Sequence, residues 1–284
     1  MEQAVPGNET QRQNPPCDAW AGEQMGGGPL PFVWLHGWGH DRTSLHRLSR
    51  LFRNDGLHWL LDQPGFGATP RLSDGVDGQA AGSAEYAENL AAIWNRLYSD
   101  STGQEGVVLI GHSFGARVAI QFAARYPDKV AALILISGAG IPPRRSAAFR
   151  IRAFFLRQLG RVARFTDSIA GTALTDAYRQ RFGSADYRMA EDMRGTLVRV
   201  IREDLSARAR EVRAPTLLLY GSEDRDTPPE IGRRYEACLP IARFHELGGF
   251  GHLDILDRGA YQCEALIRGF LDDLELDHTG KHRL

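Results

Sequence analysis

The sequence lacks a surplus of charge of either sign. Lysine occurs only at Lys129 and Lys281, and the 34 basic residues are balanced by 35 acidic ones, so the formal net charge is −1. A chain with so little net charge has no overall field that would attract a polyanion. We therefore expect no nucleic-acid partner and no binding to a membrane surface.

Cysteine is also scarce, with Cys17, Cys238 and Cys263 far apart in the chain. Three cysteines at these spacings match neither a disulfide framework nor a zinc site. His40 next to Asp41 is the kind of pair that metal sites use, but no H-E-x-x-H motif accompanies it. We therefore expect no metal ion and no cofactor.

Long apolar stretches are absent as well. None approaches the roughly 20 residues that a membrane-spanning helix needs. Residues 1–30 contain no basic start followed by an apolar run, which is the pattern of a secretory signal peptide. Their glutamine, asparagine, proline and glycine content predicts a flexible segment. These absences lead us to expect a cytoplasmic protein.

Five apolar runs predict the strands of a buried parallel sheet. Alternation of apolar and polar residues would indicate a solvated face, whereas these runs are apolar at almost every position. Amphipathic stretches at 84–98 and 116–125 predict helices between them. Strands that alternate with helices predict an α/β fold with a doubly wound, mostly parallel central sheet. The runs are Phe32–Leu35, Leu57–Leu61, Val107–Ile110, Ala132–Ile136 and Thr216–Tyr220.

The alternation stops after residue 140 and resumes near residue 213. Between these points the pattern is mostly helical and contains no strand. We expect a core made of residues 31–140 and 213–276, a helical cap inserted at 141–212, and a solvated tail at 277–284. An insertion between neighbouring strands, on the side where their carboxyl ends open, would cover a site there.

A serine lies between two glycines where the run at 107–110 ends and the helix at 116–125 begins. The pentapeptide, residues 111–115, reads GHSFG. On its own it has two interpretations, which are an ordinary tight turn or a turn that presents Ser113 as a nucleophile. It resembles the G-x-S-x-G nucleophile elbow of the α/β-hydrolase fold family, which also lies between a strand and a helix. The resemblance implies that Ser113 is the nucleophile.

The same family places an acid and then a histidine after the serine. The sequence GSEDRDTP, after the last strand run, resembles the family's G-x-x-D-x-x-x-P turn and implies Asp224 as the acid. Asp226 and Glu223 are the local alternatives. Nearer the end of the chain, GFGH resembles the loop that carries the base and implies His252. A serine hydroxyl needs such a base, and the base needs an orienting acid.

The loop after the first strand run reads HGWG, at residues 36–39, and resembles the family's oxyanion-hole loop. The resemblance implies that the backbone N–H groups of Trp38 and Phe114 stabilise the negative oxygen of the transition state. His36 and Gly37 are then expected in the wall of the substrate pocket.

Two features of the expected cap bear on the substrate. A helix predicted over 147–165 has an apolar stripe, which either packs the cap on the core or lines an acyl pocket through Phe155 and Leu159. Between Arg144 and Arg213 there are sixteen arginines and eight acids. Arginines on amphipathic helices usually form a solvated face. The alternative is attraction of an anionic partner, such as a carboxylate-bearing ester or an acyl carrier protein.

The resemblance implies a cofactor-free serine hydrolase with a small-molecule substrate, most simply a carboxylic ester. The same scaffold also supports carbon–carbon bond hydrolysis of a diketone-type product, lactone opening, perhydrolysis and aminopeptidase action on an N-terminal proline. The HGWG loop further resembles that of esterases acting on acyl-carrier-protein methyl esters. A small-ligand-binding protein on a retired hydrolase scaffold is the alternative from another class. A loop of this length does not select a substrate, because pocket walls come from the cap.

Overall fold

The computed structural model describes residues 20–28, 30–74, 78–98, 106–142 and 191–274. Three expected features lie outside these residues. They are the tail at 277–284, most of the cap at 141–212, and the cap helix at 147–165 with Phe155 and Leu159.

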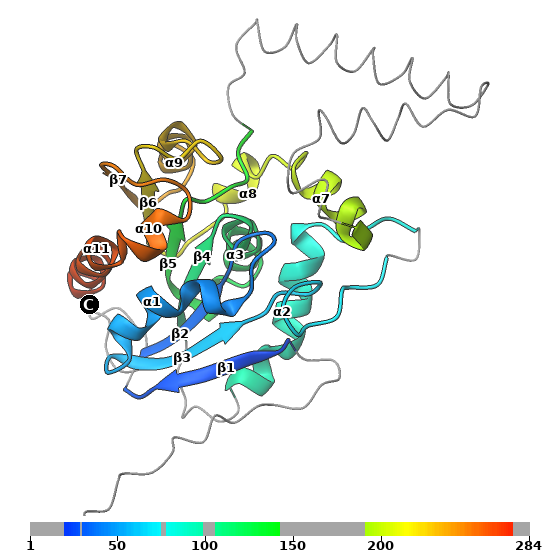
Figure 1. The fold of residues 1–284 in the computed structure, drawn as a ribbon, viewed down its shortest axis with the longest axis horizontal. Coiled ribbons are helices and arrows are strands. Elements are labelled where there is room, and N and C mark those ends of the chain that lie inside the picture. Colours follow the sequence, from blue (N-terminus) through cyan, green and yellow to red (C-terminus); the bar gives the residue numbers. More distant parts are fainter. Residues whose placement is uncertain (1–19, 29, 75–77, 99–105, 143–190, 275–284) are drawn as a thin grey trace, which may run out of the picture.

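A seven-stranded sheet forms the centre of the molecule, in the order β1-β3-β2-β4-β5-β6-β7 (Figure 1). Every neighbouring pair is parallel except β1 with β3. All five predicted runs lie in the sheet, and β4, β5 and β6 are buried along their whole length. The doubly wound, mostly parallel sheet is therefore confirmed. Its strands are β1 Gly22–Gly26, β2 Leu30–Leu35, β3 Gly56–Leu61, β4 Val107–His112, β5 Val130–Ile136, β6 Thr216–Gly221 and β7 Ala242–Leu247.

The two edge strands, β1 and β7, contain no continuous apolar run, so the sequence pattern does not predict them. They read GEQMG and ARFHEL, and most of their residues are partly exposed. An edge strand pairs on one side only and keeps polar side chains. The prediction of a flexible segment at 1–30 is wrong for residues 22–26, because their backbone pairs with β3 from Gly22 opposite Leu61 to Gly26 opposite Leu57.

Two hydrophobic cores cover the two faces of the sheet. Successive strand residues point to opposite faces, so Val33 and Leu35 join one core while Phe32 and Trp34 join the other. Helices α2, α3 and α9 pack on the first core, and α1, α10 and α11 pack on the second (Figure 1). The helices are α1 His46–Ser49, α2 Ser83–Tyr98, α3 Phe114–Arg125, α9 Pro229–Glu236, α10 Asp254–Asp257 and α11 Ala260–Asp273, with 3-10 turns at Arg42–Leu45, Arg50–Phe52 and Pro127–Lys129.

The described part of the segment between β5 and β6 is helical. It contains a 3-10 turn at Glu191–Met193 followed by α7 Arg194–Val200 and α8 Ser206–Ala209. Because β5 and β6 are neighbours in the sheet, the chain returns beside the strand that it left. Among the described residues, no helix combines the length and the apolar character that crossing a membrane requires.

Candidate active site

Ser113 forms the turn between β4 and α3. Its backbone has φ 50° and ψ −106°, a region that residues with a side chain seldom adopt. Such a conformation costs about 1–3 kcal/mol and persists only where the surrounding structure holds it. Among the described residues, Ser137 is the only other non-glycine residue with positive φ. Because strained turns of this kind concentrate at functional sites, the geometry favours the nucleophile interpretation over an ordinary turn.

The two glycines of the pentapeptide are required by close backbone contacts. A Cβ at Gly111 would lie 2.6 Å from the carbonyl oxygen of Gly115 and 2.7 Å from Ala116 Cα. A Cβ at Gly115 would collide with the carbonyl oxygen of Leu35 in β2. The N–H of Gly115 donates to the carbonyl oxygen of His36 over 3.0 Å. The turn is therefore fastened to the loop that is expected to hold the oxyanion.

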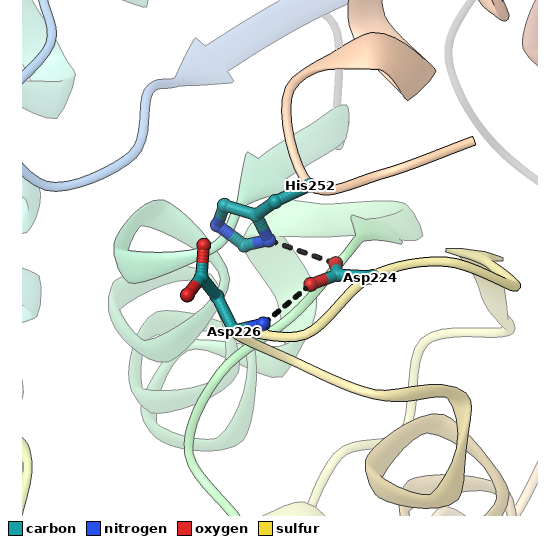
Figure 2. Close-up of side chains that lie close together, drawn as sticks. All are labelled: Asp224, Asp226 and His252. Atoms are coloured by element: carbon teal, nitrogen blue, oxygen red, sulfur yellow. Dashed lines mark hydrogen bonds and ion pairs between the residues drawn. The ribbon is translucent and has the colours of Figure 1, made fainter.

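His252 and Asp224 lie in the loops after β7 and β6, and they bond to each other. The distance from His252 Nδ1 to Asp224 Oδ2 is 2.8 Å (Figure 2). The Asp224 carboxylate also accepts the N–H groups of Asp226 over 2.9 Å and Thr227 over 2.8 Å. Burial acts to raise the pKa of Asp224, but the hydrogen bonds from His252 and Thr227 outweigh it, and the pKa lies below its usual value. Asp224 is thus ionised at neutral pH and holds the His252 proton on Nδ1.

Asp226 and Glu223, the alternative acids, do not make this hydrogen bond. Both are exposed, and Figure 2 shows the Asp226 carboxylate beside the opposite edge of the imidazole. In the part of the chain that the structure describes, Asp224, Asp226 and His252 are the only cluster whose atoms could hold a metal ion. Two of its members already share a hydrogen bond. The expected absence of a metal stays a prediction.

Ser113 and His252 line one cavity of about 390 Å³. Its wall comes from the loops that follow β2, β4, β5, β6 and β7, together with residues of α3 and α7. It therefore lies at the carboxyl ends of the strands, where ligands of α/β sheets bind. Within the described residues, no hydrogen bond joins the Ser113 hydroxyl to the His252 ring. Catalytic hydrogen bonds are often long or poorly aligned without substrate, and both side chains reach the same space.

His112 connects the elbow to the loop that carries His252. Its Nε2 lies 3.0 Å from the carbonyl oxygen of His252 and therefore carries the proton and donates. Burial lowers the pKa of His112 to about 3, so its ring stays neutral at ordinary pH. This hydrogen bond fixes the backbone of His252 relative to the neighbouring Ser113.

His36 is not among the residues that line the cavity, so its expected place in the pocket wall is corrected. Its ring is fully buried, and the N–H of Gln63 donates to Nε2 over 3.0 Å. Nδ1 therefore carries the proton and donates to the Gly37 carbonyl oxygen over 2.8 Å. Gly37 does line the cavity, and a Cβ there would lie 2.8 Å from His112 Nδ1. His36 therefore holds the loop in place through these two hydrogen bonds.

Trp38 and Phe114 both line the cavity, and their rings meet edge to face with centroids 5.3 Å apart. Phe114 is the first residue of α3, so its N–H has no partner within the helix. Neither N–H donates a hydrogen bond to any residue that the structure describes. Unpaired N–H groups beside the serine are available donors for an oxyanion, and the N-terminal end of the α3 dipole favours negative charge there.

Two residues of the site escape prediction from the sequence. Thr227 Oγ1 lies 2.8 Å from Asp224 Oδ2 and 3.1 Å from His252 Nδ1. Arg117 lines the cavity four residues after Ser113. Residues four apart share one face of a helix, and this spacing is the signal that could have identified Arg117.

The fold and the site define the class of protein. A strained serine between a strand and a helix, followed in the chain by an acid and a histidine at the carboxyl ends of a parallel sheet, is the arrangement of α/β hydrolases. The family model described as "Serine aminopeptidase, S33" (Hydrolase_4) matches residues 32–257. The match spans most of the chain, which therefore belongs to this family of α/β hydrolases.

Known relatives are hydrolases as well. A 2-hydroxy-6-oxononadienedioate/2-hydroxy-6-oxononatrienedioate hydrolase from Paraburkholderia phymatum is 27% identical over 245 residues, which are 80% of this chain and 82% of the relative. A pimeloyl-[acyl-carrier protein] methyl ester esterase from Chromobacterium violaceum is 28% identical over 82% of this chain and 91% of its own. The solved structure of a thermophilic esterase from Thermogutta terrifontis, with malate bound, aligns with a TM-score of 0.62 and 25% identity over 89% of this chain and 94% of that one. These similarities support a hydrolase, and the names of the relatives denote more than one kind of substrate.

Proposed function

We propose that the chain is a serine hydrolase that cleaves a carboxylic ester through an acyl-enzyme intermediate, without a cofactor. The observation that carries this proposal is that His252, hydrogen-bonded to the buried Asp224, lines the same cavity as the strained Ser113. A serine hydroxyl becomes nucleophilic when an imidazole takes its proton. An acid on the far nitrogen of that imidazole orients the ring and stabilises its cationic form.

In the proposed acylation step, Ser113 attacks the carbonyl carbon while His252 Nε2 takes the hydroxyl proton. Negative charge develops on the carbonyl oxygen, and the N–H groups of Trp38 and Phe114 donate to it. The ionised Asp224 stabilises the imidazolium. The tetrahedral intermediate then expels the alcohol, which His252 protonates, and Ser113 is left as the ester of the acyl group.

Deacylation uses the same groups with water as the nucleophile. His252 Nε2 takes a proton from a water molecule, which attacks the acyl carbonyl carbon. The two N–H groups again stabilise the oxyanion. When the intermediate collapses, the bond to Ser113 Oγ breaks, His252 returns the proton to Oγ, and the carboxylic acid leaves.

A second candidate is hydrolysis of a carbon–carbon bond beside a ketone. The similarity to the relative from P. phymatum favours it, because that relative's name denotes an oxo-dicarboxylic acid and no ester. The chemistry is close, since each reaction adds an oxygen nucleophile to a carbonyl and protonates the leaving group. The same three side chains would serve both reactions.

A substrate panel tests the proposal. It contains 4-nitrophenyl esters of graded acyl length, an N-terminal prolyl amide, a lactone and a vinylogous diketone. We expect turnover of the esters and a loss of at least ~10³-fold in Ser113→Ala. Ser73→Ala, at an exposed serine, serves as the control and keeps its activity. Faster turnover of the diketone than of every ester would favour the second candidate, and full ester turnover by folded Ser113→Ala would refute the serine mechanism.

A further inference from the structure

Arg117 occupies an unusual position for a charged residue, on α3 and within the same cavity as Ser113. It follows Ser113 by four residues, which is about one helical turn and a rise of roughly 6 Å. Both residues line that cavity, so α3 places the Arg117 side chain in the same space as the Ser113 hydroxyl.

The Arg117 guanidinium is buried without the hydrogen bonds that its charge requires. The side chain is only 12% exposed, and among the described residues Nη1 has no hydrogen-bond partner. Burial lowers the pKa of Arg117, but an arginine side chain keeps its proton in proteins. A buried charge is normally paired and hydrogen-bonded. The guanidinium therefore has unused capacity to bind an anion.

Glu203 forms an ion pair with Arg117 but makes no hydrogen bond to it. Its Oε2 lies 3.9 Å from Arg117 Nη1, which is too long for a hydrogen bond. Its Oε1 accepts the N–H of Ser83 over 2.9 Å, and its Oε2 has no hydrogen bond within the described residues. Glu203 therefore reduces the net charge near Arg117 and leaves Nη1 without a hydrogen bond.

The remaining wall of the cavity indicates the shape of a suitable ligand. Phe114 of α3 and Leu197 and Val200 of α7 give the cavity an apolar wall. The exposed carboxylate of Asp226 lies close to His252. A ligand anion would avoid Asp226 and approach the guanidinium. A planar guanidinium binds a carboxylate through two parallel hydrogen bonds.

We propose that Arg117 binds a carboxylate carried by the substrate, so that the preferred ester bears a free acid a few bonds from its scissile carbonyl. This inference rests on the proposed function and deepens it by naming a substrate class. The scissile carbonyl is held at Ser113, the connecting chain lies on the apolar wall, and the acid reaches the guanidinium. Arg117 is then a specificity-determining residue.

Two matched ester pairs test the proposal. In the first pair, 4-nitrophenyl glutarate carries the acid on the acyl side and 4-nitrophenyl 5-methylhexanoate is its neutral isostere. In the second, the acetyl esters of 4-hydroxybenzoate and 4-isopropylphenol place the difference on the leaving group. We expect the ratio of kcat/KM for the anionic ester to that for the neutral ester to fall about 10- to 100-fold in Arg117→Met in at least one pair, as the loss of charge-assisted hydrogen bonds predicts.

Three further variants separate binding from a structural role. Arg117→Lys keeps the charge without the planar fork and should retain part of the ratio. The double variant R117M/E203Q removes both buried charges and leaves neither one unpaired. If Arg117→Met folds poorly, the ratio of kcat/KM for the anionic ester to that for the neutral ester is measured in this double variant. Arg125→Met, on the same helix but paired with Gln121 outside the cavity, should leave the ratio as in the parent chain. If both esters of each pair lose activity equally in Arg117→Met, the residue is structural and the proposal fails.

A binding measurement keeps the inference testable apart from turnover. Calorimetric titration of Ser113→Ala with glutarate should detect binding that is at least ~10-fold weaker in S113A/R117M. Equal affinity in the two proteins, or no binding to either, would overturn the role of Arg117. If the parent chain hydrolyses no ester yet binds glutarate through Arg117, the proposed reaction fails and the carboxylate site stands.

Discussion

Asp224 and Asp226 are two residues apart, and both come near His252, but their surroundings differ. Asp224 is buried, accepts two backbone N–H groups and bonds Nδ1 of the imidazole. Asp226 is exposed and donates only its backbone N–H to the Asp224 carboxylate. The residue that orients a catalytic base has to be held in place itself. At the scale of single residues, this difference supports Asp224 over Asp226 for the proposed orienting role.

Exchange of each carboxylate for an amide tests that assignment. Asp224→Asn should lower kcat about 10³- to 10⁴-fold, because an amide would support the wrong tautomer of His252. Asp226→Asn should change kcat less than about 5-fold, because no hydrogen bond to the ring is lost. Both variants should be assayed on the best ester of the panel. A larger loss in Asp226→Asn than in Asp224→Asn would reverse the assignment.

The positions of Ser113, Asp224 and His252 could be predicted because each lies in a short motif beside a strand or a glycine turn. Arg117 and Thr227 could not be identified in the same way. The spacing of four residues from Ser113 indicates that Arg117 lies near the nucleophile, but its role depends on which side chains meet it in three dimensions. The sequence near Thr227 contains no comparable signal. The catalytic roles of the three motif residues remain a proposal, which the substitutions above test.

At the scale of elements, the turn between β4 and α3 is tightly constrained by close backbone contacts. Gly115 lies so close to the backbone of β2 that a methyl group cannot be added without movement. We expect Gly115→Ala to lower the free energy of unfolding by about 1–3 kcal/mol and to reduce activity by displacing Ser113. Urea unfolding measures the first effect and ester turnover the second.

A glycine in an open helical position provides the control for that substitution. Gly269 is exposed within α11, and a Cβ there would meet nothing within 4 Å. Gly269→Ala should therefore raise the free energy of unfolding by about 0.5–1 kcal/mol, because alanine favours a helix more than glycine does. Equal effects of the two substitutions would show that the contact with β2 does not constrain the turn.

His58 makes strand β3 sensitive to acid. Its ring is fully buried, accepts the Trp34 Nε1 proton over 3.0 Å and donates to the Phe52 carbonyl oxygen over 2.9 Å. Burial lowers the pKa of His58 to about 4. Below about pH 6.5 the unfolded chain binds a proton that the folded chain does not, so stability is lost as the pH falls from 7 towards 4.

Replacement of this histidine should flatten the pH dependence. His58 contributes roughly 2 kcal/mol to the fall in the free energy of unfolding between pH 7 and pH 5. His58→Gln keeps an acceptor for Trp34 and removes the titration, so the fall should shrink by about that amount. Urea unfolding at the two pH values measures the difference. If the free energy of unfolding fell by the same amount in His58→Gln as in the parent chain, His58 would already be protonated in the folded chain at pH 5.

The central strands could be predicted and the edge strands could not, for a physical reason. β4, β5 and β6 are buried on both faces, so nearly every residue is apolar. β1 and β7 each pair on one side and stay partly exposed, and their composition resembles that of a loop. An element whose stability comes from backbone pairing with a distant strand leaves little signal in its own sequence.

At the scale of the whole molecule, the sheet brings the candidate groups of the site together at the carboxyl ends of its strands. The proposed nucleophile, acid and base lie on loops after β4, β6 and β7, and the segment between β5 and β6 supplies α7 to the same cavity. This convergence follows from the parallel direction of the strands, which the apolar runs already indicate. The expected cytoplasmic location and the expected absence of nucleic-acid and membrane partners stay predictions.

Salt dependence separates long-range attraction of an anionic substrate from local binding. The surplus of arginine between residues 144 and 213 would act through solvent and be screened by salt, whereas a contact with the buried Arg117 would be screened much less. We expect kcat/KM for the glutarate ester to change by the same factor in the parent chain and in Arg117→Met between about 0.05 and 0.5 M salt. If kcat/KM for this ester became equal in the two proteins at high salt, Arg117 would act by long-range attraction and not by a direct contact.

The most direct measurement of the central claim is the site of covalent labelling by a fluorophosphonate, mapped by peptide mass spectrometry. We expect one adduct, on the peptide that contains Ser113. Its rate of formation should fall strongly in His252→Gln and stay unchanged in His245→Gln, a histidine of β7 outside the cavity. Heat-unfolded protein should not react. Labelling at another serine, or labelling of Ser113 at an unchanged rate without His252, would contradict the account.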